Sequence, residues 1–405
     1  MVNNSMRDWA EAYAALLMRA PEIIRRSRVT LCGMSACIDA RISMHDVPAD
    51  LTLDSAAAAD FMATIIGRMT NGVGGEIRVE WPEGPAWLAE HLPVDHAFGG
   101  TGPHAAMVLT ALGAPTLLAL EDRSAHMLRC VPGDLTLAEA GHKVAVRDVR
   151  PAGVARPDIF IFEFTAGRPA AGVVPPRSSR IIVRFGDPGL ERDDAFEALS
   201  TGLAGEAGAG LIAGFGCVPD NELDQEVGRI SALVHQWRAR GLETVHLELS
   251  TYADPAPCWR LLDGFASVVT SVGMSESELR SLTKGQETAS AMRETAVRLG
   301  LRRLCVHADH WAASVTLDDP AVERDALMMG CLLASARAEA GRPVSRPRVP
   351  DGASFAEPPL ADGALCDGWH LVSCASPNLR APATTLGLGD TFTAGCLLVL
   401  GGARE

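Results

Sequence analysis

The segment TTLGLGDTFTAGC at residues 384–396 joins two glycines, an aspartate and an apolar stretch. This pattern predicts that Gly387 and Gly389 turn the chain into a helix over residues 389–400. The first amides of a helix are unpaired and carry partial positive charge, so they can bind an anion or stabilise a moving phosphoryl group. Asp390 could then take the proton from an attacking hydroxyl. The alternative is that Asp390 only caps the helix.

Two further acidic residues stand where predicted strands end. His246 and Glu248 are two residues apart on a strand expected at 244–249, so they share one face of it. A glutamate at such a strand end can orient Mg²⁺, usually through water. Glu278 is expected at the start of a helix over 275–299. The alternatives are a solvent-facing charge for Glu248 and ordinary helix-start electrostatics for Glu278.

These residues need a scaffold, and the hydropathy pattern predicts a layered α/β fold. Apolar strands alternate with helices from about residue 190 onward, which implies parallel pairing with right-handed crossovers. The elements expected along the chain are helices at 7–27, 56–69, 105–112, 193–208, 222–240, 275–299, 320–340 and 389–400, and strands at 29–33, 72–81, 158–164, 180–185, 211–215, 244–249, 266–272 and 303–307.

The composition excludes some classes of partner and location. The chain has 405 residues and a net charge of −14, which argues against a nucleic-acid surface. It has no run of about 20 apolar residues, so no membrane span is expected. The polar segment MVNNSMRDWAEAY at residues 1–13 does not resemble a signal peptide. Ten scattered cysteines without a CxxC pair indicate thiols in a reducing cytoplasm.

Five segments together resemble the ADP-dependent glucokinase and phosphofructokinase family of the ribokinase-like superfamily. They are GLGD at 387–390, VHLELS at 245–250, SVGMSESEL at 271–279, IFIFEF at 159–164 and FGGTGPHAA at 98–106. The resemblance implies a large nucleotide-binding domain with a mainly parallel central sheet and a smaller α+β lid that binds the sugar. The predicted large domain is 1–38, 98–150 and 186–405, and the predicted lid is 39–97 and 151–185.

The same resemblance assigns roles to residues around the predicted sugar. It implies that Asp39 accepts hydrogen bonds from sugar hydroxyls, although a turn-stabilising aspartate is the alternative. The glycine turn, His104 and Glu76 are also placed on the sugar side. The alternatives are a helix-start residue for His104 and an exposed strand carboxylate for Glu76. The substrate-binding residues predicted on this basis are Asp39, Glu76, Gly99, Gly100, Thr101, His104 and Arg180.

The chain departs from the family pattern at four positions, two of which lie in the segment CGMSACIDAR at 32–41 that contains Asp39. Ser35 and Cys37 replace asparagines, Thr101 stands where Gln or Asn is usual, and Ser275 stands where Asn is usual. The departures at the sugar side predict rebuilt specificity contacts. The departure at Ser275 affects the predicted arrangement of the contacts around the metal.

The nucleotide side is defined less sharply by the sequence. Arg180 is the residue that we expect to bind an anion, either a sugar phosphate or the nucleotide phosphates. His307 falls near the family's adenine side, and a structural strand-end histidine is the alternative. No GxxxxGK[ST] loop exists, which argues against a P-loop enzyme. The preference for ADP therefore depends on the resemblance alone.

The sequence thus predicts an ADP-dependent kinase that phosphorylates a sugar or a sugar phosphate. Asp390 is the expected base, and the amides of Gly387, Leu388 and Gly389 are expected to stabilise the phosphoryl group. Glu248 and Glu278 are expected to organise Mg²⁺. One alternative is an ATP-dependent carbohydrate or nucleoside kinase with the same fold. The other is an inactive sugar- or nucleotide-binding protein.

Overall fold

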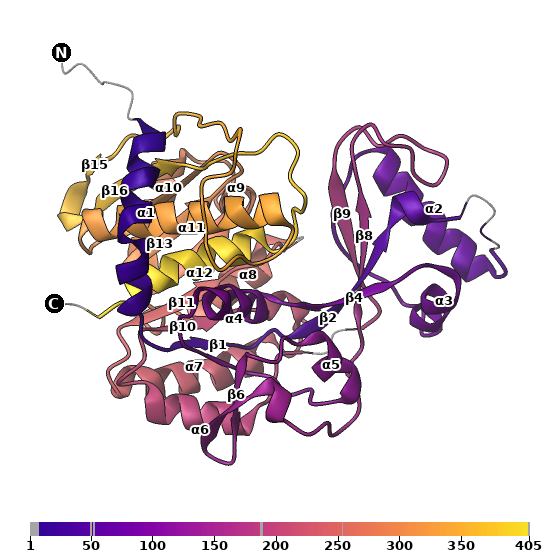
Figure 1. The fold of residues 1–405 in the computed structure, drawn as a ribbon, viewed down its shortest axis with the longest axis horizontal. Helices are drawn as coiled ribbons and strands as arrows, with labels where there is room; N and C mark the ends of the chain where they lie inside the picture. Colours follow the sequence, from indigo (N-terminus) through magenta and orange to yellow (C-terminus); the bar gives the residue numbers. More distant parts are fainter. Residues whose placement is uncertain (1–7, 49–50, 52, 187–188, 253, 404–405) are drawn as a thin grey trace.

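The computed structural model describes residues 8–48, 51, 53–186, 189–252 and 254–403. Residues 1–7 lie outside this part, and they include the first residue of the helix expected at 7–27. The molecule has two sheets, and Figure 1 shows a smaller lobe joined to a larger body by β2 and β4. The predicted domain boundaries stay a prediction, but the strands of the smaller sheet come from residues 37–99 and 159–184.

The larger sheet has eleven strands. Its centre is parallel from β13 through β6, and antiparallel strands lie at both edges. In spatial order the strands are β15 (Gly363–Ala364), β16 (His370–Ala375), β14 (Trp311–Thr316), β13 (Arg303–His307), β12 (Ser271–Ser275), β11 (Thr244–Glu248), β10 (Ala209–Ile212), β1 (Thr30–Cys32), β5 (Thr116–Leu118), β6 (Thr136–Glu139) and β7 (His142–Ala145).

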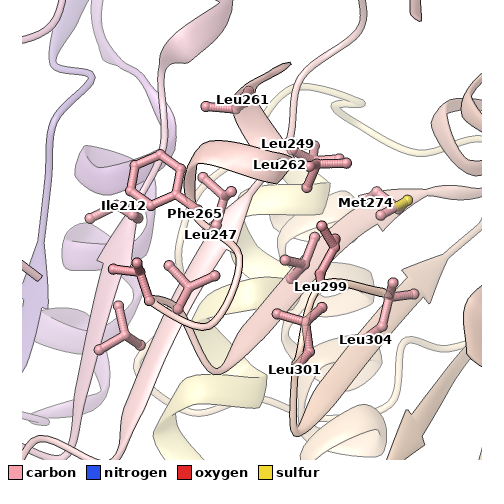
Figure 2. Close-up of a cluster of buried hydrophobic side chains, with 14 of the residues drawn as sticks. Ile212, Leu247, Leu249, Leu261, Leu262, Phe265, Met274, Leu299, Leu301 and Leu304 are labelled. Atoms are coloured by element: carbon pink, nitrogen blue, oxygen red, sulfur yellow. The ribbon is translucent and has the colours of Figure 1, made fainter. Parts of the chain in front are cut away.

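Helices cover both faces of this sheet, which explains why its central strands are almost entirely buried. One face carries α6 (Asp194–Leu203), α7 (Leu223–Ala239), α8 (Pro255–Gly264), α9 (Glu276–Leu282) and α10 (Thr288–Arg298). The other carries α1 (Trp9–Arg25), α4 (Thr101–Leu112), α5 (Ala125–Cys130), α11 (Pro320–Ala340) and α12 (Leu388–Leu400). Figure 2 shows part of the first core, where Phe265 at the end of α8 lies beside Leu247 and Ile212 of two strands.

The smaller sheet has five strands and its own core. Its order is β3 (Gly75–Arg78), β9 (Ser179–Arg184), β8 (Ile159–Phe164), β2 (Cys37–Ser43) and β4 (Asp95–Gly99). Its helices are α2 (Ala56–Thr70) and α3 (Gly84–His91). Apolar side chains of α2, α3, β2, β8 and β9 form this separate core. The lobe is therefore held together by its own hydrophobic contacts.

Three expected elements were wrong in detail. The strand expected at 211–215 is β10 at Ala209–Ile212, and a short 3-10 helix begins at Phe215. The continuous helix expected at 275–299 is two helices, because Lys284 and Gly285 take left-handed conformations between α9 and α10. The strand expected at 266–272 is β12 at Ser271–Ser275, and the apolar residues before it lie in a turn around Ser267, whose φ is 61°. Among the described residues, every helix is too short or too polar to cross a lipid bilayer.

Candidate active site

The start of α12 is built around Gly387. This glycine caps the helix with a φ of 67°, so Asp390 is the third helical residue and the alternative that Asp390 only caps the helix is wrong. Leu388 is the first residue of the helix. The Thr391 hydroxyl donates a 2.6 Å hydrogen bond to the Gly387 carbonyl and so fixes the turn. Gly389 has no left-handed conformation, but a Cβ there would lie 3.2 Å from His307 Cε1.

A buried arginine lies directly beneath this turn. Arg337 of α11 donates hydrogen bonds from Nη1 to Thr391 Oγ1 and from Nη2 to His104 Nδ1, each at 3.1 Å. Burial and the neighbouring Arg337, Arg41 and Arg180 lower the pKa of His104 to about 3, so this imidazole is neutral. His104 therefore supports Arg337, a contact that neither sequence interpretation of His104 anticipated.

Arg337 was missed by the sequence analysis. The signal was available in LLASARAEA, where a single arginine interrupts an apolar helical run between two alanines that the structure buries. A charge in such a position needs a specific partner. Burial lowers the pKa of Arg337, although the charges of Asp390 and Asp39 oppose this shift. The positive charge of the Arg337 guanidinium therefore interacts favourably with the carboxylates of Asp390 and Asp39.

The Asp390 carboxyl lies near groups that shift its pKa in opposite directions. Burial raises its pKa, a hydrogen bond from Thr101 lowers it, and the charge of Glu248 raises it again. The charges of Arg337 and Arg180 lower the pKa. Thr101 is the first residue of α4, which packs against α12. The glycine turn before α4 therefore reaches the start of α12, and a raised pKa makes Asp390 a stronger base than an exposed aspartate.

Asp39 approaches the same place from the smaller sheet. It lies within β2 and is buried, so the alternative that it stabilises a turn is wrong. Burial raises its pKa to about 7, a hydrogen bond from Cys37 opposes this shift, and the charge of Asp390 adds to it. A Cβ on Gly99 would lie 2.2 Å from Asp39 Oδ1. Gly99 therefore leaves room for this carboxyl group.

Gly100 shapes the other side of the turn. Its φ is 101°, and a Cβ there would lie 1.8 Å from the Ser35 carbonyl oxygen. The Ser35 hydroxyl accepts a 3.4 Å hydrogen bond from the Gly102 amide. The segments with Ser35 and with Gly100 are thus in direct contact, and Ser35 serves here as a structural partner of the glycine turn.

Glu248 lies at the centre of a hydrogen-bond network. Its carboxylate accepts from His246 Nε2 at 2.9 Å, Thr393 Oγ1 at 3.0 Å and His307 Nε2 at 3.4 Å. Burial would raise its pKa, but the hydrogen bonds and charges of the two histidines lower it to about 2. Glu248 is 7% exposed, so the alternative of a solvent-facing charge is wrong.

His307 is the charged partner in this network. Burial would lower its pKa, but the hydrogen bond and charge of Glu248 raise it to about 9. Its ring lies 5.2 Å from the ring of Phe392 and beside Gly389. The structure therefore puts a cationic imidazole next to the start of α12. A role in binding nucleotide stays a prediction.

Glu278 and Ser275 form a capping box at the start of α9. The Glu278 amide donates to Ser275 Oγ at 3.3 Å, and the Ser275 amide donates to Glu278 Oε2 at 2.7 Å. Thr251 Oγ1 donates to Glu278 Oε1 at 3.2 Å. The helix-start interpretation of Glu278 therefore describes one of its contacts, and the serine in place of asparagine is used as the cap.

The two glutamates fit a hydrated divalent cation. A carboxylate has about four acceptor sites, of which three in Glu248 and two in Glu278 are used by protein donors. A cavity of about 70 Å³ beside Glu278 is also lined by Ser250, Thr251 and Ser277, which leaves room for water. The remaining acceptor sites suit the water molecules that surround Mg²⁺.

The smaller lobe contributes arginines on β9. Arg180 Nη1 donates to the Thr385 carbonyl at 3.3 Å, which links this lobe to the loop before Gly387. Buried guanidinium nitrogens of Arg41, Arg180 and Arg337 have no hydrogen-bond partner in the described part of the chain. Such donors fit an anionic ligand. Glu76, in contrast, is ion-paired with Arg184 at 2.7 Å.

Comparison with known proteins gives a consistent result. A family model described as the ADP-specific phosphofructokinase/glucokinase conserved region matches residues 30–357. Among curated proteins, none matches this chain.

Two solved structures share the fold over nearly all of both chains. An ADP-dependent kinase in complex with fructose-6-phosphate and ADPβS has a TM-score of 0.78 and 17% identity, with 98% of this chain and 99% of that chain covered. The last common ancestor of ADP-dependent phosphofructokinases from Methanosarcinales has a TM-score of 0.74 and 17% identity, with 99% and 100% covered.

Proposed function

Because the chain belongs to the ADP-specific phosphofructokinase/glucokinase family, a family of ADP-dependent sugar kinases, we propose that Asp390 is its catalytic base. In this proposal Asp390 takes the proton of a sugar hydroxyl while that oxygen attacks the terminal phosphoryl group of ADP. The O–P bond to the sugar forms, the bond to AMP breaks, and AMP leaves. The supporting observation is that Asp390 and Asp39 come from different lobes and lie near enough for the charge of Asp390 to raise the pKa of Asp39.

The neighbouring groups support separate parts of this reaction. The unpaired amides at the start of α12 and the guanidinium of Arg337 supply positive charge for the phosphoryl oxygens. Arg180 comes from the smaller lobe and adds a further donor beside Thr385. His307, with its raised pKa, is a cation beside Gly389 at neutral pH. We assign these three side chains to the donor phosphates.

Asp39 and the turn Gly99–Gly100–Thr101 are the proposed acceptor contacts. A carboxylate can accept hydrogen bonds from two sugar hydroxyls, and the glycines allow close approach of the backbone. Because Glu76 is neutralised by Arg184, it repels a phosphorylated sugar less than a free carboxylate would. Unphosphorylated and phosphorylated sugars are therefore both included in the test below.

Kinases of this kind use a divalent metal, and we propose Mg²⁺ as the ion. Glu248 and Glu278 would hold it through water, since both carboxylates keep direct hydrogen bonds to the protein. When bound, Mg²⁺ would neutralise part of the negative charge of the donor phosphates. His246 and His307 keep Glu248 ionised, and the hydrogen bond from Thr393 helps to fix its orientation.

The decisive experiment is Asp390→Asn in an assay of AMP release. Wild-type protein with ADP, Mg²⁺ and either glucose or fructose 6-phosphate should release AMP with at least one acceptor. The variant should lose a factor of about 10²–10⁴ in kcat and keep its affinity for ADP, because only the base is removed.

Asp194→Asn is the matched control, because Asp194 is an exposed aspartate at the start of α6. It should behave as wild type. Unchanged kcat in Asp390→Asn would contradict the assignment of the base. Turnover with ATP alone would contradict ADP as donor, and a wild-type protein that binds ADP without turnover would favour a binding protein.

A further inference from the structure

Three side chains outside the proposed active site converge where the two lobes join. His96 Nε2 lies 3.2 Å from Asp158 Oδ2, and His126 Nε2 lies 3.1 Å from both carboxylate oxygens of Asp158. The ligand atoms of these three residues all lie within 4.8 Å of one another. Two imidazole nitrogens and a carboxylate that lie this close together form a donor set that zinc sites use.

The three residues come from both parts of the fold. His96 lies on β4, and Asp158 immediately precedes β8, so the two flank β2 in the smaller sheet. His126 lies on α5, which the chain forms between β5 and β6 of the larger sheet. An ion held by all three would connect the smaller sheet to the larger body.

A buried aspartate joins the segments that carry two of the three ligands, His126 and Asp158. Asp122 accepts from the Ser124 amide at 2.8 Å and from the Arg156 amide at 2.9 Å. Ser124 caps α5 two residues before His126, and Arg156 lies two residues before Asp158. Asp122 therefore holds together the two backbone segments that carry these ligands, which is the kind of support that metal sites require.

We infer that His96, His126 and Asp158 bind a transition-metal ion of the zinc type at the junction of the lobes. Two imidazole nitrogens and one carboxylate suit Zn²⁺ or Co²⁺ better than Mg²⁺, which prefers oxygen ligands. Three protein ligands leave one tetrahedral position for water. The site is separate from Glu248 and Glu278 and shares no residue with them.

Arg129 gives the proposal a specific prediction. Its Nη2 donates to His126 Nδ1 at 3.3 Å, so without an ion the neutral imidazole carries its proton on Nε2. Metal binding at Nε2 moves that proton to Nδ1, where it opposes the Arg129 donor. Arg129→Ala should therefore tighten metal binding, by roughly two- to fivefold if the exposed contact is worth what surface pairs usually contribute.

The test is a Zn²⁺ titration of the full chain against a chromophoric chelator, with excess Mg²⁺ present throughout. Wild type should bind one more Zn²⁺ per chain than His96→Ala, His126→Ala or Asp158→Asn. Each of these variants should lose roughly tenfold or more in affinity at this site. His142→Ala removes an exposed histidine on β7 and should bind as wild type does. Co²⁺ should give the visible absorption of a tetrahedral site in wild type, and this absorption should be absent from the three ligand variants.

Two further measurements guard against variants that fail to fold. Zn²⁺ should slow hydrogen exchange in β4 of wild type, because the ion fixes His96 to α5. Arg129→Ala keeps all three ligands, so its affinity can be read without disturbing them. Equal Zn²⁺ stoichiometry in wild type and His126→Ala, or no tightening in Arg129→Ala, would overturn the inference.

Discussion

Gly387→Ala is the most informative single change in this molecule, because it moves the turn of α12 without removing any side chain that reacts. An alanine at a φ of 67° costs about 1–2 kcal/mol, since its Cβ approaches the following carbonyl. That Cβ would also lie 2.7 Å from Arg337 Nη2 and 2.9 Å from Cζ. Arg337 is buried, so it cannot swing into solvent to relieve this contact.

The contact with Arg337 sets the magnitude of the effect. If the guanidinium loses one of its two hydrogen bonds, to His104 or to Thr391, the protein loses about 1.5–3 kcal/mol more, because these bonds involve a charged group. Gly387→Ala should therefore lower the free energy of unfolding by about 2.5–5 kcal/mol in total. Movement of Asp390 and the amides beside it should lower kcat by roughly 100-fold.

Gly113→Ala provides the matched comparison. Gly113 ends α4 with a φ of 85°, and a Cβ there would meet no atom within 4 Å. This variant should show the backbone cost alone and normal kcat. Chemical unfolding and AMP-release kinetics would be measured for both variants. If the two lose equal stability and both keep wild-type kcat, Arg337 does not support the turn in the way described.

Two other predictions follow from individual side chains. Asp39 has a pKa raised to about 7, so its carboxyl is mostly protonated below that pH and accepts fewer hydrogen bonds. The KM for the acceptor should therefore fall as the pH rises through 7 in wild type. A KM profile with the same inflection in Asp39→Asn would refute the assignment. Ser275→Ala removes the cap of α9 and should cost about 0.5–2 kcal/mol of unfolding free energy, whereas Ser277→Ala, which keeps the cap, should cost less in the same denaturant titration.

The sequence predicted those helices and strands that have a strong hydropathy period and clear end signals. The helices at α7, α11 and α12 and the strand β13 lie within two residues of their expected bounds, because long apolar runs with clear ends determine them. In contrast, α8 was missed because its two prolines resemble a loop, although Pro255 follows the capping residue Asp254 and starts the helix. The glycine at 285 is a common helix-ending signal that could have predicted the break between α9 and α10.

The site was predictable where one motif carries the chemistry, and not where contacts join distant segments. Asp390 and Glu248 follow from local patterns. Arg337, by contrast, reaches His104 across 233 positions of sequence, and Thr393 reaches Glu248 across 145. The partner of Glu76 is similarly remote, since Arg184 lies on a different strand. Such contacts depend on tertiary packing that periodicity and spacing do not encode.

The placement of Asp39 and Asp390 on different lobes has a consequence for the timing of catalysis. If the lobes rotate apart, the group that aligns the acceptor and the group that deprotonates it separate in the same movement. Water that enters the open gap then meets the donor without an aligned base, so ADP would be spared from wasteful hydrolysis. The junction strands β2 and β4 would carry that movement, and any ligand that stiffens them would alter how often productive encounters occur.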